Sequence, residues 1–189
     1  FYDYSSIGIQ YYHGSSIGNT FKRLRDSDPY SAEIYYQRQV NVSPTWNHTK
    51  RLPHWGIGLF ATNSGSRKYI GTIVCAYPYM KLPLFTAGPL ESNFRFGFGL
   101  AWVQKIYNKE TNPENLLLSQ KLNTHANLSW QNELRLSSHH FISAGVSFYH
   151  ASNAKRTIPN LGINIPAVSV GYRYAFHADT KKPVQRNDS

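Results

Sequence analysis

The chain has 189 residues, enough for one domain with a substantial interior, and its formal net charge is +10. Cys75 is its one cysteine, which excludes an intrachain disulfide and a metal site built from several cysteines. No run of about 18 apolar residues occurs, which excludes a transmembrane helix. The 14 Tyr and 10 Phe favour strands, and the positive charge indicates an anionic partner: phospholipid, lipopolysaccharide or nucleic acid.

Apolar residues alternate with polar or small residues in eight segments. Because successive side chains of a strand point to opposite faces, this alternation predicts eight strands with one apolar face each. In chain order the segments are 7–12, 32–40, 55–61, 69–78, 94–102, 122–136, 141–152 and 164–176. The alternation is most regular in 94–102, and Arg38 interrupts the apolar row of 32–40.

The second face of several predicted strands carries charged and amide side chains. These residues are Arg95, Gln131, Glu133, Arg135 and Arg173. They would be poor residues for the core of a sandwich, but they suit the interior of a small barrel whose outer surface meets lipid. The even strand number and the aromatic Phe176 at the end of the last segment are also typical of bacterial outer-membrane barrels.

The pattern therefore predicts an all-β fold, an eight-stranded antiparallel transmembrane β-barrel of the outer membrane, over residues 1–176. Residues 177–189 are polar and are expected to form a flexible periplasmic tail. The alternative is a soluble barrel of lipocalin type or a sandwich, which would reverse the pattern and put the charges outside. The location of Arg95, Glu133 and Arg173 distinguishes the two.

Connection lengths predict the orientation. With both termini periplasmic, the external loops are 13–31, 62–68, 106–121 and 153–163, and the inner turns are 41–54, 79–93 and 137–140. Basic residues then gather at the outer rim, where they would attract the phosphates of lipopolysaccharide. They include Arg23, Arg25, Arg67, Lys68, Lys105, Lys109, Lys155 and Arg156. A role as ordinary solvated loop residues stays open for each of them.

His150 and Ser152 lie two residues apart at the end of a predicted strand and so share one face. The preceding residues of that face are Ile142, Ala144, Val146 and Phe148, all apolar. His150 could therefore act as general base to Ser152 at a lipid-facing surface, as acyl transfer requires. A lone His-x-Ser pair is common by chance, so a purely structural role stays open. The other histidines show no metal-ligand spacing, and no metal site is predicted.

The string His-Ala-Ser-Asn-Ala at 150–154, followed by Pro-Asn-x-Gly-Ile at 159–163, resembles the lipid A 3-O-deacylase (PagL-like) family. In Bacteroidota such proteins often carry the label acyloxyacyl hydrolase. The resemblance also covers residues 94–99, 111–113 and the rest of 150–176. It implies an eight-stranded outer-membrane barrel that hydrolyses an ester-linked acyl chain of lipid A. It further implies a Ser-His-Glu triad on the lipid-facing surface and no cofactor.

On this resemblance, His150 matches the base, Ser152 the nucleophile and Asn153 the residue implicated in oxyanion stabilisation. The family's Glu falls on Asn164, and no Asp or Glu occurs between Glu133 and Asp179. An Asn carbonyl can accept the imidazole N–H and fix its tautomer, but it brings no full charge to stabilise the imidazolium. Lys155 stands where the family prefers a small Gly, and it could crowd the oxyanion site.

Three functions follow as hypotheses. The first is a lipid A deacylase of the outer membrane, with lipopolysaccharide as partner and Lys155, Arg156, Arg23 and Arg25 as candidate substrate-binding residues. The second is a catalytically inactive barrel that serves as an accessory subunit of a larger outer-membrane complex, as the missing carboxylate and the break at Arg38 suggest. The third is a soluble lipid- or nucleic-acid-binding barrel. Since no nucleic-acid recognition motif is present, no nucleic-acid partner is predicted.

Overall fold

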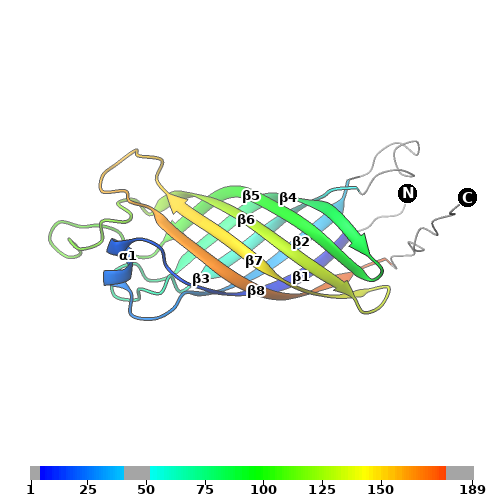
Figure 1. Cartoon of the computed structure of the whole chain (residues 1–189). Coiled ribbons are helices and arrows are strands. Elements are labelled where there is room, and N and C mark those ends of the chain that lie inside the picture. Colours follow the sequence, from blue (N-terminus) through cyan, green and yellow to red (C-terminus); the bar gives the residue numbers. More distant parts are fainter. Residues whose placement is uncertain (1–4, 41–51, 178–189) are drawn as a thin grey trace, which may run out of the picture.

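The computed structural model describes residues 5–40 and 52–177. In this part of the chain, eight antiparallel strands form a closed barrel in which each strand pairs with its sequence neighbours and β1 pairs with β8 (Figure 1). The elements are β1 (Ser5–Gly14), α1 (Asn19–Leu24), β2 (Tyr30–Gln39), β3 (His54–Thr62), β4 (Ile73–Ala87), β5 (Leu90–Val103), β6 (Leu122–Arg135), β7 (His140–Ser152) and β8 (Ile163–Ala175). The predicted fold class is confirmed.

Apolar side chains cover the outside of the barrel and polar ones fill much of its inside. Leu59, Phe98 and Val168 are each about three-fifths exposed, whereas Arg95 and Glu133 are buried in the interior. The soluble alternative, which required charges outside, is therefore wrong. An apolar exterior around a closed sheet is the arrangement that a lipid bilayer stabilises.

The Glu33 carboxylate on β2 organises one half of the interior. It accepts hydrogen bonds from the guanidinium of Arg95 on β5, with Nη1 at 3.1 Å, and from the hydroxyl groups of Tyr12 and Tyr77. The same guanidinium stacks on the ring of Tyr79, 3.6 Å from its centroid. Several strands thus contribute hydrogen-bond partners to one buried carboxylate. A charge inside a protein is tolerated only when it has such partners.

A second buried carboxylate, Glu133 on β6, lies nearer the end of the barrel where β1 begins and β8 ends. It accepts a hydrogen bond from Lys81 Nζ at 2.6 Å and from Arg173 Nε at 2.9 Å. The guanidinium of Arg173 packs over the ring of Phe141 at 3.8 Å. Arg95, Glu133 and Arg173, which the sequence placed on the second face, are therefore interior residues with charge partners.

Glycines give the interior tyrosines their space. A Cβ at Gly97 or at Gly99 on β5 would lie 2.5 Å from a side-chain atom of Tyr77. The glycine-rich inner face of 94–102 is therefore required for the tyrosine to reach Glu33.

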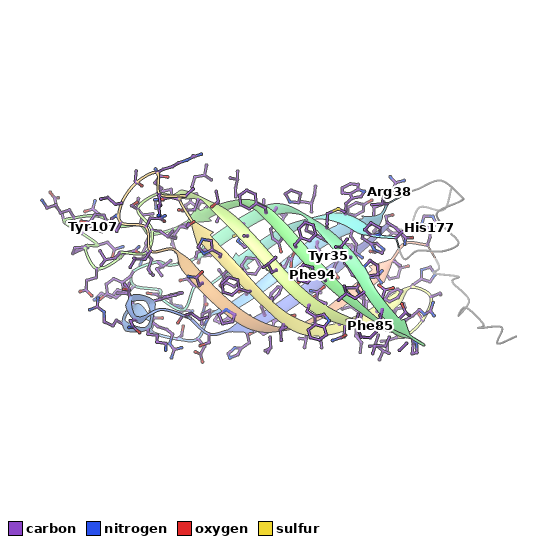
Figure 2. The ribbon with its side chains drawn as sticks, turned by 45° about the horizontal axis from the view of Figure 1, so that its top comes forward. Tyr35, Arg38, Phe85, Phe94, Tyr107 and His177 are labelled. Atoms are coloured by element: carbon purple, nitrogen blue, oxygen red, sulfur yellow. The ribbon has the colours of Figure 1, made fainter. Side chains whose placement is uncertain are left out.

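The two ends of the barrel differ. β1 begins and β8 ends at one end, and α1 and the long loops lie at the other (Figure 1). Tyr107 projects from the loop end, whereas Arg38, Phe85 and His177 lie at the opposite end (Figure 2). Arg38 is the next-to-last residue of β2. Its break in the apolar row therefore falls at the rim, where a long cationic side chain can extend toward water.

One predicted inner turn, 79–93, is wrong. β4 continues to Ala87 and β5 starts at Leu90, so only Gly88 and Pro89 connect them. The alternation is lost there because the register shifts between Pro83 and Phe85, although the two strands stay paired up to Ala87 and Leu90. The hairpin lies at the end of the barrel where β1 begins and β8 ends (Figure 1).

The predicted strand 69–78 begins too early. β4 starts at Ile73, and Ile70, an apolar residue of the predicted segment, is fully buried in the preceding loop. The backbone N–H groups of Ile70 and Gly71 both donate to the Ser66 carbonyl, and Gly71 has φ +72°. This turn removes Ile70 from the strand and packs it beneath the loop.

Two predicted segments extend past the described residues. Of the inner turn 41–54, residues 41–51 lie outside them, and so does the tail 177–189 apart from His177. Within residues 5–40 and 52–177, no helix has the length and apolar character needed to cross a bilayer.

The Glu33–Arg95 pair yields a stability prediction. Arg95→Met leaves the Glu33 carboxylate buried without its counter-charge, so the free energy of unfolding should fall by about 3–5 kcal/mol. Urea titration of the barrel in phospholipid vesicles, followed by Trp fluorescence, measures this. Glu110→Gln in an exposed loop is the control and should change little; equal stability of Arg95→Met and the wild type would contradict the prediction.

Candidate active site

His150, Ser152 and Asn164 meet on the outer face of the barrel at its loop end. β7 carries the first two, and in the antiparallel register with β8 Asn164 lies directly opposite His150. His150 Nδ1 is 2.8 Å from Asn164 Oδ1, and His150 Nε2 is 3.0 Å from Ser152 Oγ. Because the Asn164 side-chain oxygen can only accept a hydrogen bond, His150 Nδ1 carries the proton. Nε2 then accepts a hydrogen bond from the Ser152 hydroxyl. The arrangement is that of a nucleophile, a base and an orienting group.

Gly162 explains how the imidazole fits above Ser152. Its φ of +73° is in the left-handed region, and a Cβ at this position would lie 3.0 Å from Cε1 of His150 and 3.5 Å from Cβ of Ser152. Any larger residue would push the imidazole away from its partners. Gly162 was part of the recognised Pro-Asn-x-Gly-Ile string, but the sequence did not identify it as a site residue.

The surface beneath the three residues is apolar. On β6, the small Ala126 faces His150 and Leu128 faces Phe148, while on β8 Pro166 faces Phe148. Above them Thr124 faces Ser152 and its Oγ1 donates to the Ser152 carbonyl at 2.8 Å. The polar group therefore sits at the upper edge of the lipid-facing surface.

Asn153 anchors the loop that follows Ser152. Its side-chain amide donates to Ser119 Oγ at 3.0 Å, to the Thr157 carbonyl at 2.9 Å and to Thr157 Oγ1 at 3.0 Å. Its backbone N–H donates to Asn160 Oδ1 at 3.1 Å. The donors expected to stabilise an oxyanion thus bind loop partners in this structure, and the oxyanion role of Asn153 stays a prediction. Sequence reasoning missed Ser119, Thr157 and Asn160.

Backbone hydrogen bonds hold the site between its neighbours. The N–H groups of Leu161 and Gly162 donate to the carbonyls of Leu116 and Leu117 at 3.2 and 3.0 Å. On the other side, the Ile17 N–H donates to the Asn164 carbonyl at 3.1 Å. The three loops at 15–18, 116–119 and 153–162 therefore form one connected frame around the site.

The four basic residues predicted to bind substrate lie in two loops. Lys155 and Arg156 are exposed in the loop that begins after Ser152, and Ala154 and Lys155 have φ of +55° and +60°. Arg23 belongs to α1, and exposed Arg25 forms an ion pair with Asp28 at 3.1 Å. A substrate role for all four stays a prediction. Within the described ranges, no three His, Cys, Asp or Glu residues gather where they could hold a metal ion.

The fold and the outward polar group define an outer-membrane β-barrel with a candidate hydrolytic site. The family model for lipid A 3-O-deacylase (PagL) matches residues 30–173, and the chain belongs to this family. The predicted family and the outer-membrane location are thereby confirmed.

Two solved structures have the same fold at low sequence identity. Neisserial surface protein A is 8% identical with a TM-score of 0.64, and the match covers 91% of this chain and 97% of that one. The outer membrane enzyme PagL is 14% identical with a TM-score of 0.58, covering 87% and 97%. Comparison with curated proteins gives no sequence match.

The hydrogen bonds of Asn153 predict the protease sensitivity of its loop. Asn153→Ala removes the hydrogen bonds of this amide to Ser119 and Thr157, so the loop should open more often and trypsin should cleave after Lys155 or Arg156 about ten times faster. Ser152→Ala, which leaves these bonds intact, serves as the control. Mass spectrometry of the fragments over time measures both rates, and equal rates would show that Asn153 does not hold the loop.

Proposed function

We propose that this chain is a serine esterase of the outer membrane that removes an ester-linked acyl chain from lipid A. The observation that carries the proposal is the hydrogen-bonded series Ser152–His150–Asn164 on the outer surface, at the boundary between the apolar barrel wall and the polar loops. A substrate in the outer leaflet places its ester groups near this boundary and its acyl chains along the wall.

The chemistry requires only groups of this chain and water. Ser152 Oγ attacks the acyl carbonyl while its proton passes to His150 Nε2, which then protonates the departing sugar oxygen. The C–O bond to the sugar breaks and leaves the acyl group on Ser152. Water then attacks that ester with His150 as base, and the free fatty acid departs.

Asn164 sets the expected rate. Its Oδ1 holds Nδ1–H of His150 and so keeps Nε2 free to accept a proton. It adds no negative charge beside the imidazolium that forms during attack. In serine proteases, replacing the acid of the triad by its amide lowers turnover by about four orders of magnitude. We therefore expect a slow enzyme, limited by formation of the tetrahedral intermediate.

The surroundings support one orientation of the proposed substrate. The apolar wall around Ala126, Phe148 and Pro166 receives the acyl chain, because contact with this wall preserves the chain's lipid-like environment. Lys155 and Arg156 stand in the next loop, where cationic side chains would meet the phosphate groups of lipid A. For Asn153 to stabilise the oxyanion, one of its donors must exchange its loop partner for the substrate.

Mass spectrometry of lipid A tests the activity. Cells that produce the chain should lose one acyl group from lipid A, and cells that produce Ser152→Ala should not. Ser147→Ala is the matched control, since Ser147 lies on the same strand but faces the barrel interior. It should keep the wild-type activity.

If lipid A stayed unchanged in cells that produce the wild type, Ser152→Ala or Ser147→Ala, with all three proteins folded, the proposed esterase activity would be contradicted. The alternative function, an inactive barrel that acts as accessory subunit of an outer-membrane complex, would then account for the chain. Its specific readout is an intact complex recovered with the barrel after mild detergent extraction.

A further inference from the structure

A cavity of about 570 Å³ lies among the loops at the loop end of the barrel, where β4 and β6 begin and β5 ends. We call it the loop cavity. It lies between residues 68–69 and residues 104–121, and its lining includes Lys68, Tyr69, Gln104, Lys105, Asn112 and Lys121. None of these residues takes part in the Ser152–His150–Asn164 series.

Side-chain amides hold the walls of the loop cavity in place. Asn112 Nδ2 donates to the carbonyls of Tyr69 and Ile106 at 2.9 and 2.8 Å. Asn115 Nδ2 donates to the carbonyls of Tyr69 and Lys105 at 3.0 and 3.2 Å. The two loops are thus tied together across the cavity. Walls held in place in this way lower the ordering cost of binding.

The lining is cationic. It carries three lysines and one acid, Glu114, so its formal charge is +3 − 1 = +2. Lys105 Nζ donates to the carbonyls of Arg67 and Lys68 at 2.8 and 3.1 Å, which fixes its position and leaves a third N–H for a ligand. A hydrogen bond with Tyr69 raises the pKa of Lys68, so this ammonium stays charged at neutral pH.

The position relative to the membrane follows from Lys121 and Trp102. Lys121 Nζ donates to the Gln104 carbonyl and lies 5.5 Å from the ring centroid of Trp102. Trp102 is an exposed residue at the loop end of β5, where tryptophan marks the boundary between hydrocarbon and head groups. The loop cavity therefore lies at the level of the lipid head groups.

The segment 104–121 separates the loop cavity from the candidate active site. Its first part lines the cavity, while the Leu116 and Leu117 carbonyls and Ser119 Oγ contact the loop at 153–162. The two sites thus use different residues of the same segment.

We propose that the loop cavity binds a phosphorylated sugar of lipopolysaccharide, as a second site apart from Ser152. Ammonium groups bind phosphate through charge-assisted hydrogen bonds. The Gln104 side chain, the side-chain oxygen of Asn112, the Thr111 hydroxyl and the Tyr69 ring suit a ligand that carries hydroxyl groups. The proposal rests on the outer-membrane location and does not require esterase activity.

The test measures binding to the Ser152→Ala protein in detergent micelles, so that loss of catalysis cannot affect the result. The probe is the diphosphorylated glucosamine disaccharide that remains when lipid A loses all its acyl chains, and calorimetry gives its Kd. Lys68→Gln should raise this Kd about tenfold, because one charge-assisted contact is lost. Lys68→Arg should restore most of the affinity.

Lys109→Gln is the matched control, since it removes the same charge from an exposed residue of the 104–121 segment outside the lining. Its Kd should stay close to that of the parent. If Lys68→Gln and Lys109→Gln weakened binding of the probe equally, the loss of affinity would follow from overall charge alone, and the proposal would be overturned. It would also be overturned if the disaccharide without phosphates bound equally well, or if inorganic phosphate alone bound as tightly as the probe.

Discussion

Closure of the sheet under strict strand alternation is the constraint on which the rest of the structure depends. Lipid offers no hydrogen-bond partners, so the backbone groups of a membrane-spanning sheet must pair with one another, and β1 with β8 completes the ring. Alternation then divides the side chains into a lipid-facing set and an interior set. Within the hydrocarbon region, charged residues can only enter the interior, where Glu33 pairs with Arg95, and Glu133 pairs with Lys81 and Arg173.

The same constraint shapes the candidate site. Polar side chains on the outer face are costly within the hydrocarbon, so His150, Ser152 and Asn164 are confined to the loop end, and their hydrogen bonds are made with each other. Loop contacts then determine the precision of the group. Gly162 leaves room for the imidazole, and Asn153 ties the following loop to Ser119 and Thr157. The site is thus built jointly by the barrel wall and by the loops.

The sequence predicted the two-sided character of the strands, and with it the interior location of Arg95 and Glu133 and the shared outer face of His150 and Ser152. These follow from a period of two, which needs no tertiary information. The pairing of Asn164 with His150 came from the family resemblance. The hairpin at 79–93 was missed because prolines and a register shift obscure the alternation there. The contacts of Asn153 with Ser119 could not be found, since they join residues 34 positions apart through loops without periodicity.

The most direct measurement is the labelling rate of Ser152 by a fluorophosphonate, which forms a covalent bond with an activated serine and needs no lipid. Peptide mass spectrometry after labelling of the folded barrel in micelles locates and quantifies the adduct. The account predicts an adduct on Ser152, none after His150→Ala, and faster labelling after Asn164→Glu, because a carboxylate would stabilise the imidazolium. No adduct on Ser152 in either the wild type or Asn164→Glu, with the barrel folded, would contradict the claim that His150 activates this serine.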